Sequence, residues 1–264
     1  GNTQLKKVTL GPSLKVIPRS AFAYNLNLTQ INLNHVEEIG DEAFFGNFGT
    51  IKGQGEVNNQ SYFVFADSYD GNGLRSISLD NCKKIGSASF AFAVWLESVY
   101  APVITEIGDY SFRGYQSIDS FTNPKNFVFV SDLKRVDLGT TERDIKVGDV
   151  AFGLCQKLES INTENVTEIG IQAFYYDKKL TSLNLNKLVK AGASAISLCE
   201  ELEAVDITSL KNIPANLFSG SKKLVSVAFN ENIESIGANA IFNTAIEEIN
   251  LTYTLTEISD SALS

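Results

Sequence analysis

The sequence LESINTENVTEIGIQAF, residues 158–174, is the clearest copy of a unit that recurs about ten times along the chain. It opens with a leucine, places an isoleucine three positions later, and continues to an Ile-Gly pair and then an Ala-Phe pair. From Leu158 onward, a new copy begins every 22 residues. Repetition at this period is typical of a solenoid, whose core grows as neighbouring copies stack.

All ten copies align on an opening apolar residue. The openers are Leu5, Leu28, Leu74, Leu96, Leu133, Leu158, Leu180, Leu202, Leu224 and Ile246. Apolar, often β-branched residues follow three and usually five positions later, which predicts a short strand with one buried face. A second apolar cluster follows and usually ends in Ile-Gly, but Pro18 and Pro214 replace the glycine in two copies. Because proline holds φ near about −65°, we predict that this slot begins a short helical turn, where glycine leaves room for close packing.

The Ala-Phe pair predicts a column of aromatic side chains inside the array. Its members are Phe22, Phe44, Phe90, Phe112, Phe152, Phe174 and Phe218. We interpret these rings as core rather than as a cofactor site. Cys155 and Cys199 share another slot of the unit, two copies apart and beyond bonding reach, and we interpret them as small buried side chains without a disulfide.

The pattern Leu-x-x-Ile-x-Leu followed by Ile-Gly-x-x-Ala-Phe resembles the BspA-like branch of the leucine-rich repeats. Residues 133–153 and 158–174 show it most clearly, and the similarity covers residues 5–264. It departs from the better-known type in lacking an invariant asparagine after the strand. The resemblance implies one domain over residues 1–264: a right-handed leucine-rich-repeat solenoid of about ten 22-residue units, each a β-strand and a short helical turn.

The same resemblance implies a location and a general role. Members of this family are similar to exported or surface-anchored proteins of gut and oral anaerobes and some protozoa, and some are adhesins for host extracellular proteins. We therefore expect an extracellular or cell-surface protein whose export signal has been removed.

Composition excludes several other classes of function. Lys and Arg number 22 against 31 Asp and Glu, a net charge of −9, so neither nucleic acid nor an anionic membrane surface is an expected partner. No apolar run reaches the roughly 18 residues of a membrane span, so we expect no direct membrane insertion. The one histidine, His35, has no nucleophile or metal-ligand motif to accompany it. We predict no enzyme activity, no cofactor and no metal site.

The polar strand face offers one candidate binding site. Residues two and four positions after each opener point outward, and most of them are small and polar. Tyr100, Arg135 and Asp137 are the exceptions. Since tyrosine and arginine are enriched in binding hot spots, this neighbourhood is a candidate site on an otherwise solvated face.

Two insertions, residues 46–73 and 113–132, offer a second candidate site. Both follow the Ala-Phe turn, so they leave the same edge of the array and flank the copy that contains Trp95. Each contains an apolar run, at residues 62–65 and 127–130, and the two runs could pair as a small sheet over Trp95. This sheet either covers the edge or presents aromatic side chains such as Tyr69 and Tyr115 to a partner.

Three functions remain open. The favoured one is a non-enzymatic recognition or adhesion protein that binds a macromolecular ligand, in particular a host extracellular protein. The second is a carbohydrate-binding module that uses Trp95, Tyr100 and the insertion aromatics as stacking platforms for a glycan. The third is an architectural spacer. Burial of Trp95 and the insertion tyrosines would remove the platforms that the second function needs.

Overall fold

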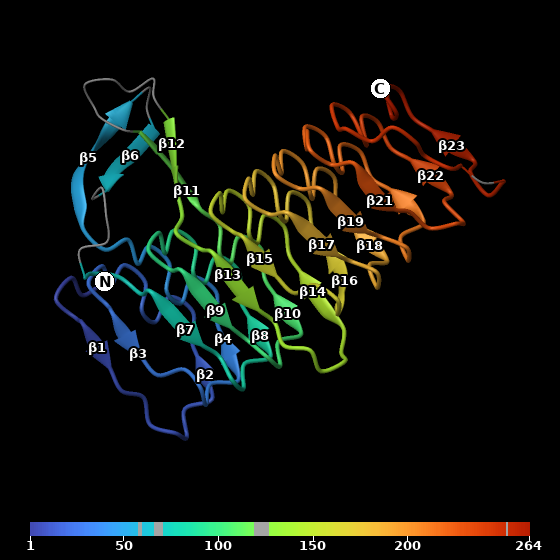
Figure 1. The fold of residues 1–264 in the computed structure, drawn as a ribbon. Helices are drawn as coiled ribbons and strands as arrows, with labels where there is room; N and C mark the ends of the chain where they lie inside the picture. The colour runs from blue at the N-terminus through green and yellow to red at the C-terminus, as the bar shows by residue number, and fades with distance from the viewer. Residues whose placement is uncertain (58–59, 66–70, 119–126, 252) are drawn as a thin grey trace.

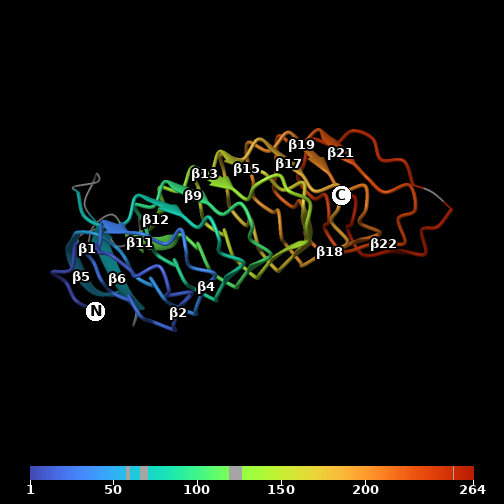
Figure 2. The ribbon, with the colours of Figure 1, turned by 90° about the horizontal axis from the view of Figure 1, so that it is seen from below.

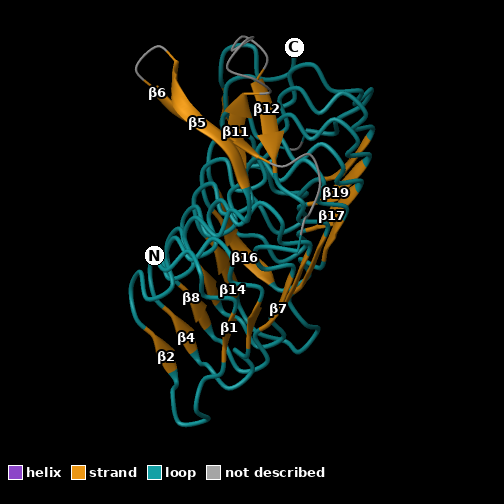
Figure 3. Ribbon diagram, turned by 90° about the vertical axis from the view of Figure 1, so that its left-hand side faces the viewer, coloured by secondary structure: helices purple, strands orange, loops and turns teal. Residues whose placement is uncertain are grey.

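The computed structural model describes residues 1–264 except 58–59, 66–70, 119–126 and 252. About ten turns of chain stack into one elongated, curved array with the two termini at opposite ends (Figure 1). Most copies contribute two short strands. The strand that comes first in each copy lies along one side of the array, and the strand that comes second lies along the other side (Figure 2). No helix occurs in the described residues (Figure 3). The predicted repeat solenoid is confirmed, and its handedness stays a prediction.

In the first nine copies, the first strand begins two residues after the opener. These strands are β1 (Lys7–Val8), β3 (Gln30–Ile31), β7 (Ser76–Ser78), β9 (Ser98–Tyr100), β13 (Arg135–Asp137), β15 (Ser160–Ile161), β17 (Ser182–Asn184), β19 (Ala204–Asp206) and β21 (Ser226–Ala228). They pair in parallel in three groups, β1-β3, β7-β9-β13-β15 and β17-β19-β21. Val136 lies in register with Val99 and Ile161, and all three are buried. The predicted strand with one buried face is therefore confirmed.

The second apolar cluster of each copy also forms a strand, which the sequence did not predict. These strands are β2 (Val16–Ile17), β4 (Glu38–Ile39), β8 (Lys84–Ile85), β10 (Glu106–Ile107), β14 (Ile145–Val147), β16 (Val166–Ile169), β18 (Lys190–Ala191), β20 (Asn212–Ile213), β22 (Ser235–Ile236) and β23 (Glu257–Ile258). They form a seven-stranded sheet from β2 to β18 and a three-stranded sheet from β20 to β23. The break falls at Pro214. In the copy before it, the Gly192 N–H donates to the Ile169 carbonyl at 2.9 Å, and proline has no N–H to make this bond.

The predicted short helical turn is wrong. The third residue after the second strand has a left-handed φ of 53° to 58° in every copy, at Ser20, Glu42, Ala88, Tyr110, Val150, Gln172, Ser194, Asn216, Asn239 and Ser261. Successive N–H groups in this turn point alternately toward the next copy and back into the turn. The Phe152 N–H donates to the Ala173 carbonyl of the next copy at 2.9 Å, and the Gly153 N–H donates to the Val150 carbonyl of its own turn. These bonds between copies offset a cost of about 1–2 kcal/mol for each left-handed residue.

The glycine before this turn packs as predicted. Gly192 does not have a left-handed φ, and a Cβ at this position would lie 2.3 Å from the Ile171 backbone nitrogen of the previous copy. In this copy the position therefore favours glycine, because two backbones approach each other closely there.

The predicted aromatic column forms the centre of the core. Ring centroids of successive members lie 4.9 to 5.5 Å apart in stacked geometry from Phe22 through Phe44, Phe90, Phe112 and Phe152 to Phe174. Phe218 is also fully buried. Cys155 and Cys199 are buried and free, which confirms their interpretation as core residues without a disulfide, and Cys82 is buried and free as well.

Each insertion forms an antiparallel hairpin of its own. In the first, β5 (Ile51–Val57) pairs with β6 (Gln60–Phe65), and in the second, β11 (Tyr115–Ile118) pairs with β12 (Phe127–Val130). Both project from the same edge of the array (Figures 1 and 3). The two apolar runs thus pair within their insertions rather than with each other. The hairpins meet where the Ser117 hydroxyl donates to the Phe63 carbonyl.

Candidate binding surface

A groove crosses the central group of the first sheet, β7-β9-β13-β15. Strand register places Tyr100 directly beside Ser78 and Asp137, and it places Arg135 between Ser98 and Ser160. These residues line a shallow open groove of about 780 Å³. The structure therefore brings together Tyr100, Arg135 and Asp137, the three strand-face residues that the sequence singled out.

Small neighbours leave the large side chains of this groove accessible. Tyr100 is 42% exposed, and Arg135 and Asp137 are also exposed. Ser78 on β7 lies beside Tyr100 and Ser160 on β15 lies beside Arg135, and these short side chains add no bulk next to either large side chain. Arg135 makes no ion pair with any residue that the structure describes. An accessible aromatic ring, a guanidinium and a carboxylate on a rigid sheet are suited to recognising another protein.

The two insertions cover Trp95 instead of displaying it. Trp95 is only 5% exposed and packs in a small second core with Phe48 and Val94. Tyr115 joins this core, with its ring centroid 5.0 Å from that of Phe92. The Trp95 and Tyr115 rings are not part of the groove. Because both pack against neighbouring side chains, they cannot serve as stacking platforms for a sugar. Tyr69 lies outside the described residues.

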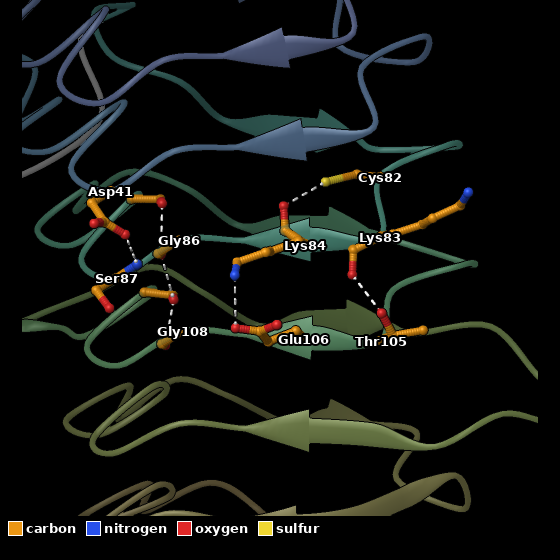
Figure 4. Close-up of polar contacts among 11 residues, drawn as sticks. Asp41, Cys82, Lys83, Lys84, Gly86, Ser87, Thr105, Glu106 and Gly108 are labelled. Carbon is orange, nitrogen blue, oxygen red and sulfur yellow. Dashed lines mark hydrogen bonds and ion pairs between the residues drawn. The ribbon is translucent and has the colours of Figure 1, made fainter.

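Sequence reasoning missed a ladder of alternating charges on the second sheet. Its members, in register from strand to strand, are Glu38, Lys84, Glu106, Lys146, Glu168 and Lys190. Ion pairs join Lys84 to Glu106 at 3.2 Å (Figure 4) and Lys146 to Glu168 at 2.6 Å. A hydrogen bond to Glu106 raises the pKa of Lys84, and one from Lys146 lowers the pKa of Glu168.

The ladder adds little stability, because its pairs are solvent-exposed and therefore individually weak. Its alternating signs place an opposite charge on each neighbouring strand, whereas pairing that skipped a copy would put like charges opposite each other. The signal was present in the sequence, because the residue just before the last apolar residue of the second cluster changes sign from copy to copy between Glu38 and Lys190.

A buried acid also escaped the sequence analysis. Asp177 occupies the same slot as Cys155 and Cys199, and its side chain is fully buried. Its Oδ1 accepts the Cys155 N–H at 2.8 Å, while Oδ2 has no hydrogen-bond partner among the described residues. Burial raises the pKa of the Asp177 carboxyl well above its ordinary value. The pKa values of the Cys155 and Cys199 thiols are also raised, mainly by burial and to a smaller extent by the nearby Asp177. These groups are sealed in the core and cannot reach a ligand.

Within the described residues, no group of three or more His, Cys, Asp and Glu side chains is placed to hold a metal ion. The same part of the chain has no helix that could span a membrane.

Comparison with known proteins identifies the repeat. A comparison with curated proteins finds no match. Among solved structures, a leucine-rich repeat protein from Bacteroides ovatus is similar over 99% of this chain and 71% of its own, with 20% identity and a TM-score of 0.52, which supports the fold. The leucine-rich repeat protein of T. pallidum is 21% identical over 70% of this chain and 81% of its own, with a TM-score of 0.43. A leucine-rich cell surface protein from Faecalibacterium prausnitzii is 17% identical over 85% of this chain and 60% of its own, with a TM-score of 0.37.

The family model for the BspA-type leucine-rich repeat region matches residues 1–91 and 145–264 in six copies. The part that it leaves out, residues 92–144, contains the second hairpin, the strands β9 and β10 before it and the strand β13 after it. The match covers more than half of the chain, and the fold and core positions agree with it. The chain therefore belongs to the BspA-type leucine-rich repeat family.

Proposed function

We propose that this chain is a non-enzymatic recognition protein, exposed at a cell surface or secreted, that binds a protein ligand through the groove on β7, β9, β13 and β15. The observation that carries the proposal is the presence of Tyr100 and Arg135, both accessible, in one groove of about 780 Å³. Tyrosine and arginine contribute more binding energy than most residues because they combine a large contact area with directional polar groups.

The groove favours a protein ligand over a glycan. Its volume, shallow shape and extent over four strands suit an extended segment or convex surface of another protein. The glycan alternative relied on several aromatic platforms, but Trp95 and Tyr115 pack inside the edge, which leaves Tyr100 as the ring exposed in the groove. Membership of the BspA-type family supports the proposed surface location, because the family resembles exported and surface-anchored proteins.

A binding panel tests this proposal. The purified chain would be applied to immobilised host extracellular matrix proteins and, in parallel, to a glycan array. We expect saturable binding to at least one protein. The double variant Tyr100→Ala/Arg135→Ala should lose that binding, and the matched variant Asn184→Ala, on the same face of β17 outside the groove, should keep it.

Each other outcome of the panel counts against the proposal. Binding to neither panel would favour an architectural spacer, and binding to glycans alone would favour the carbohydrate module. Protein binding that survives the double variant would show that another surface is used.

A further inference from the structure

A second, smaller pocket lies where the second insertion leaves the array. It has a volume of about 350 Å³ and is walled by the turns of two successive copies. Val150 and Leu154 come from one turn, and Gln172 and Tyr176 come from the next, and all four have left-handed φ values. Val150 and Gln172 occupy the same position of successive copies and form one column. Leu154 and Tyr176 share another position and form a second, parallel column, and both columns line the pocket.

The second insertion closes one side of this pocket. In the column that contains Leu154 and Tyr176, the preceding copy has Gly114, and a Cβ there would lie 2.4 Å from the Leu154 carbonyl oxygen. The chain then turns away into β11, and Arg113 and Gln116, on either side of this glycine, become part of the lining. Two regular turns and one irregular segment thus build the pocket together.

Arg113 is the charged residue among those that line this pocket. Its guanidinium carbon lies 5.7 Å from the centre of the Phe92 ring and 5.9 Å from that of Tyr110, so two aromatic rings hold the group in place. Its Nε is buried without a hydrogen-bond acceptor, and no carboxylate of the described residues pairs with it. An anion in the pocket would meet the guanidinium of Arg113, which lines it, and would supply the charge-assisted pairing that no described carboxylate gives this group.

The other lining groups narrow the class of anion. A planar carboxylate can accept two parallel N–H bonds from a guanidinium. Two amides, from Gln116 and Gln172, and the phenol of Tyr176 can hydrogen-bond to hydroxyl groups, while Val150 and Leu154 offer an apolar wall. The ring of Tyr175 stacks on that of Tyr176, with centroids 6.0 Å apart, and adds aromatic surface.

A single sugar ring that carries a carboxylate combines these requirements. It has one planar anion, several hydroxyls and an apolar face of C–H groups, and a volume of about 350 Å³ is near the lower end for small-ligand sites. We propose that this pocket binds a carboxylate-bearing sugar, such as the acidic terminal residue of a glycan, with Arg113 holding the carboxylate. This site is separate from the first-sheet groove and does not depend on it.

Calorimetric titration of the whole chain with small defined probes tests the pocket. The probes are sialyllactose, glucuronic acid, neutral lactose, inorganic phosphate and a short peptide with a free C-terminus. We expect the two carboxylated sugars to bind at least tenfold more tightly than lactose. Arg113→Lys keeps the charge but removes the planar fork, and it should weaken acidic-sugar binding at least tenfold.

Two further variants separate recognition from folding and from the groove. Gln172→Ala removes one amide at a left-handed position where another copy has Ala88, so it should fold normally and still weaken binding of the acidic sugars. Arg135→Ala alters the first-sheet groove and should leave sugar binding unchanged. Thermal unfolding of each variant would establish that it is folded.

Four results would overturn this assignment. Equal affinity for lactose and sialyllactose would remove the role of the carboxylate, and equal affinity for phosphate would reduce the pocket to an unselective anion site. Tighter binding of the peptide would identify a chain terminus as the ligand. Failure of both acidic sugars to bind the folded wild-type chain would show that the pocket has no such function.

Discussion

The buried carboxyl of Asp177 makes the stability of this protein depend on pH in a defined way. Its Oδ1 accepts the Cys155 N–H at 2.8 Å, and its Oδ2 has no partner among the described residues. Asn25 occupies the same slot in an earlier copy, and its Oδ1 accepts the Asn2 N–H at 2.7 Å. Since asparagine makes the same backbone contact without a titrating group, Asp177→Asn should stabilise the protein at neutral pH.

The size of this gain follows from proton linkage. Below the unfolded-state pKa, Asp177 is protonated in both states and carries no penalty. As the pH rises through that value, the unfolded chain releases a proton that the folded chain keeps, because burial raises the folded-state pKa. The wild type then loses about 1.4 kcal/mol of stability per pH unit relative to the variant until the folded-state pKa is reached.

Urea unfolding of wild type and Asp177→Asn measures this difference between about pH 3, below the ordinary pKa of an aspartate carboxyl, and about pH 8. We expect similar stabilities at the acidic end and a gap that widens as the pH rises. Asp260→Asn, which changes an exposed carboxylate, serves as the control and should show no such gap. Two parallel profiles for wild type and Asp177→Asn would refute the assignment of a penalised buried acid.

Two further predictions concern the close packing of the copies. Gly192→Ala should lower the free energy of unfolding by about 1–3 kcal/mol, because the added Cβ meets the backbone of the previous copy, whereas Gly11→Ala, with nothing within 4 Å, should have little effect in the same urea titration. The buried thiols of Cys82, Cys155 and Cys199 should not react with a disulfide reagent at mild alkaline pH until the chain is unfolded, because burial raises all three pKa values, that of Cys82 to about 11. Comparable destabilisation by both alanines, or rapid thiol reaction in the folded state, would contradict this packing.

The repeat period predicted the parts of the fold that each copy specifies for itself. Val136 and Phe152 lie where the spacing of apolar residues puts them, in a buried strand position and in the aromatic column. The second sheet escaped prediction because its clusters mostly end in Ile-Gly or Ile-Pro, which we interpreted as leading into a turn rather than as a strand. The turn was misjudged because bonds to the next copy hold Val150 in a left-handed conformation, which local propensity disfavours.

The candidate site was also predictable only where it follows the repeat. Tyr100 and Asp137 share one slot in neighbouring copies, and Arg135 lies two residues before Asp137 on the same strand face, so the period alone brings the three to one face. The burial of Trp95 was not predictable, because it depends on how two irregular hairpins pack over the edge. The pocket beside Arg113 depends on the same irregular segment and has no signature in the repeat.

The affinity of a groove variant for a protein ligand tests the proposed recognition surface most directly. With the first matrix protein that the panel retains, surface plasmon resonance would compare wild type, Tyr100→Ala and Asn184→Ala. Truncating a central hot-spot side chain costs about 2 kcal/mol or more, so Tyr100→Ala should weaken binding at least about 30-fold. Asn184→Ala should stay within about twofold of wild type, in line with the small effects of residues outside an interface. Equal affinities for all three proteins would contradict recognition through this groove.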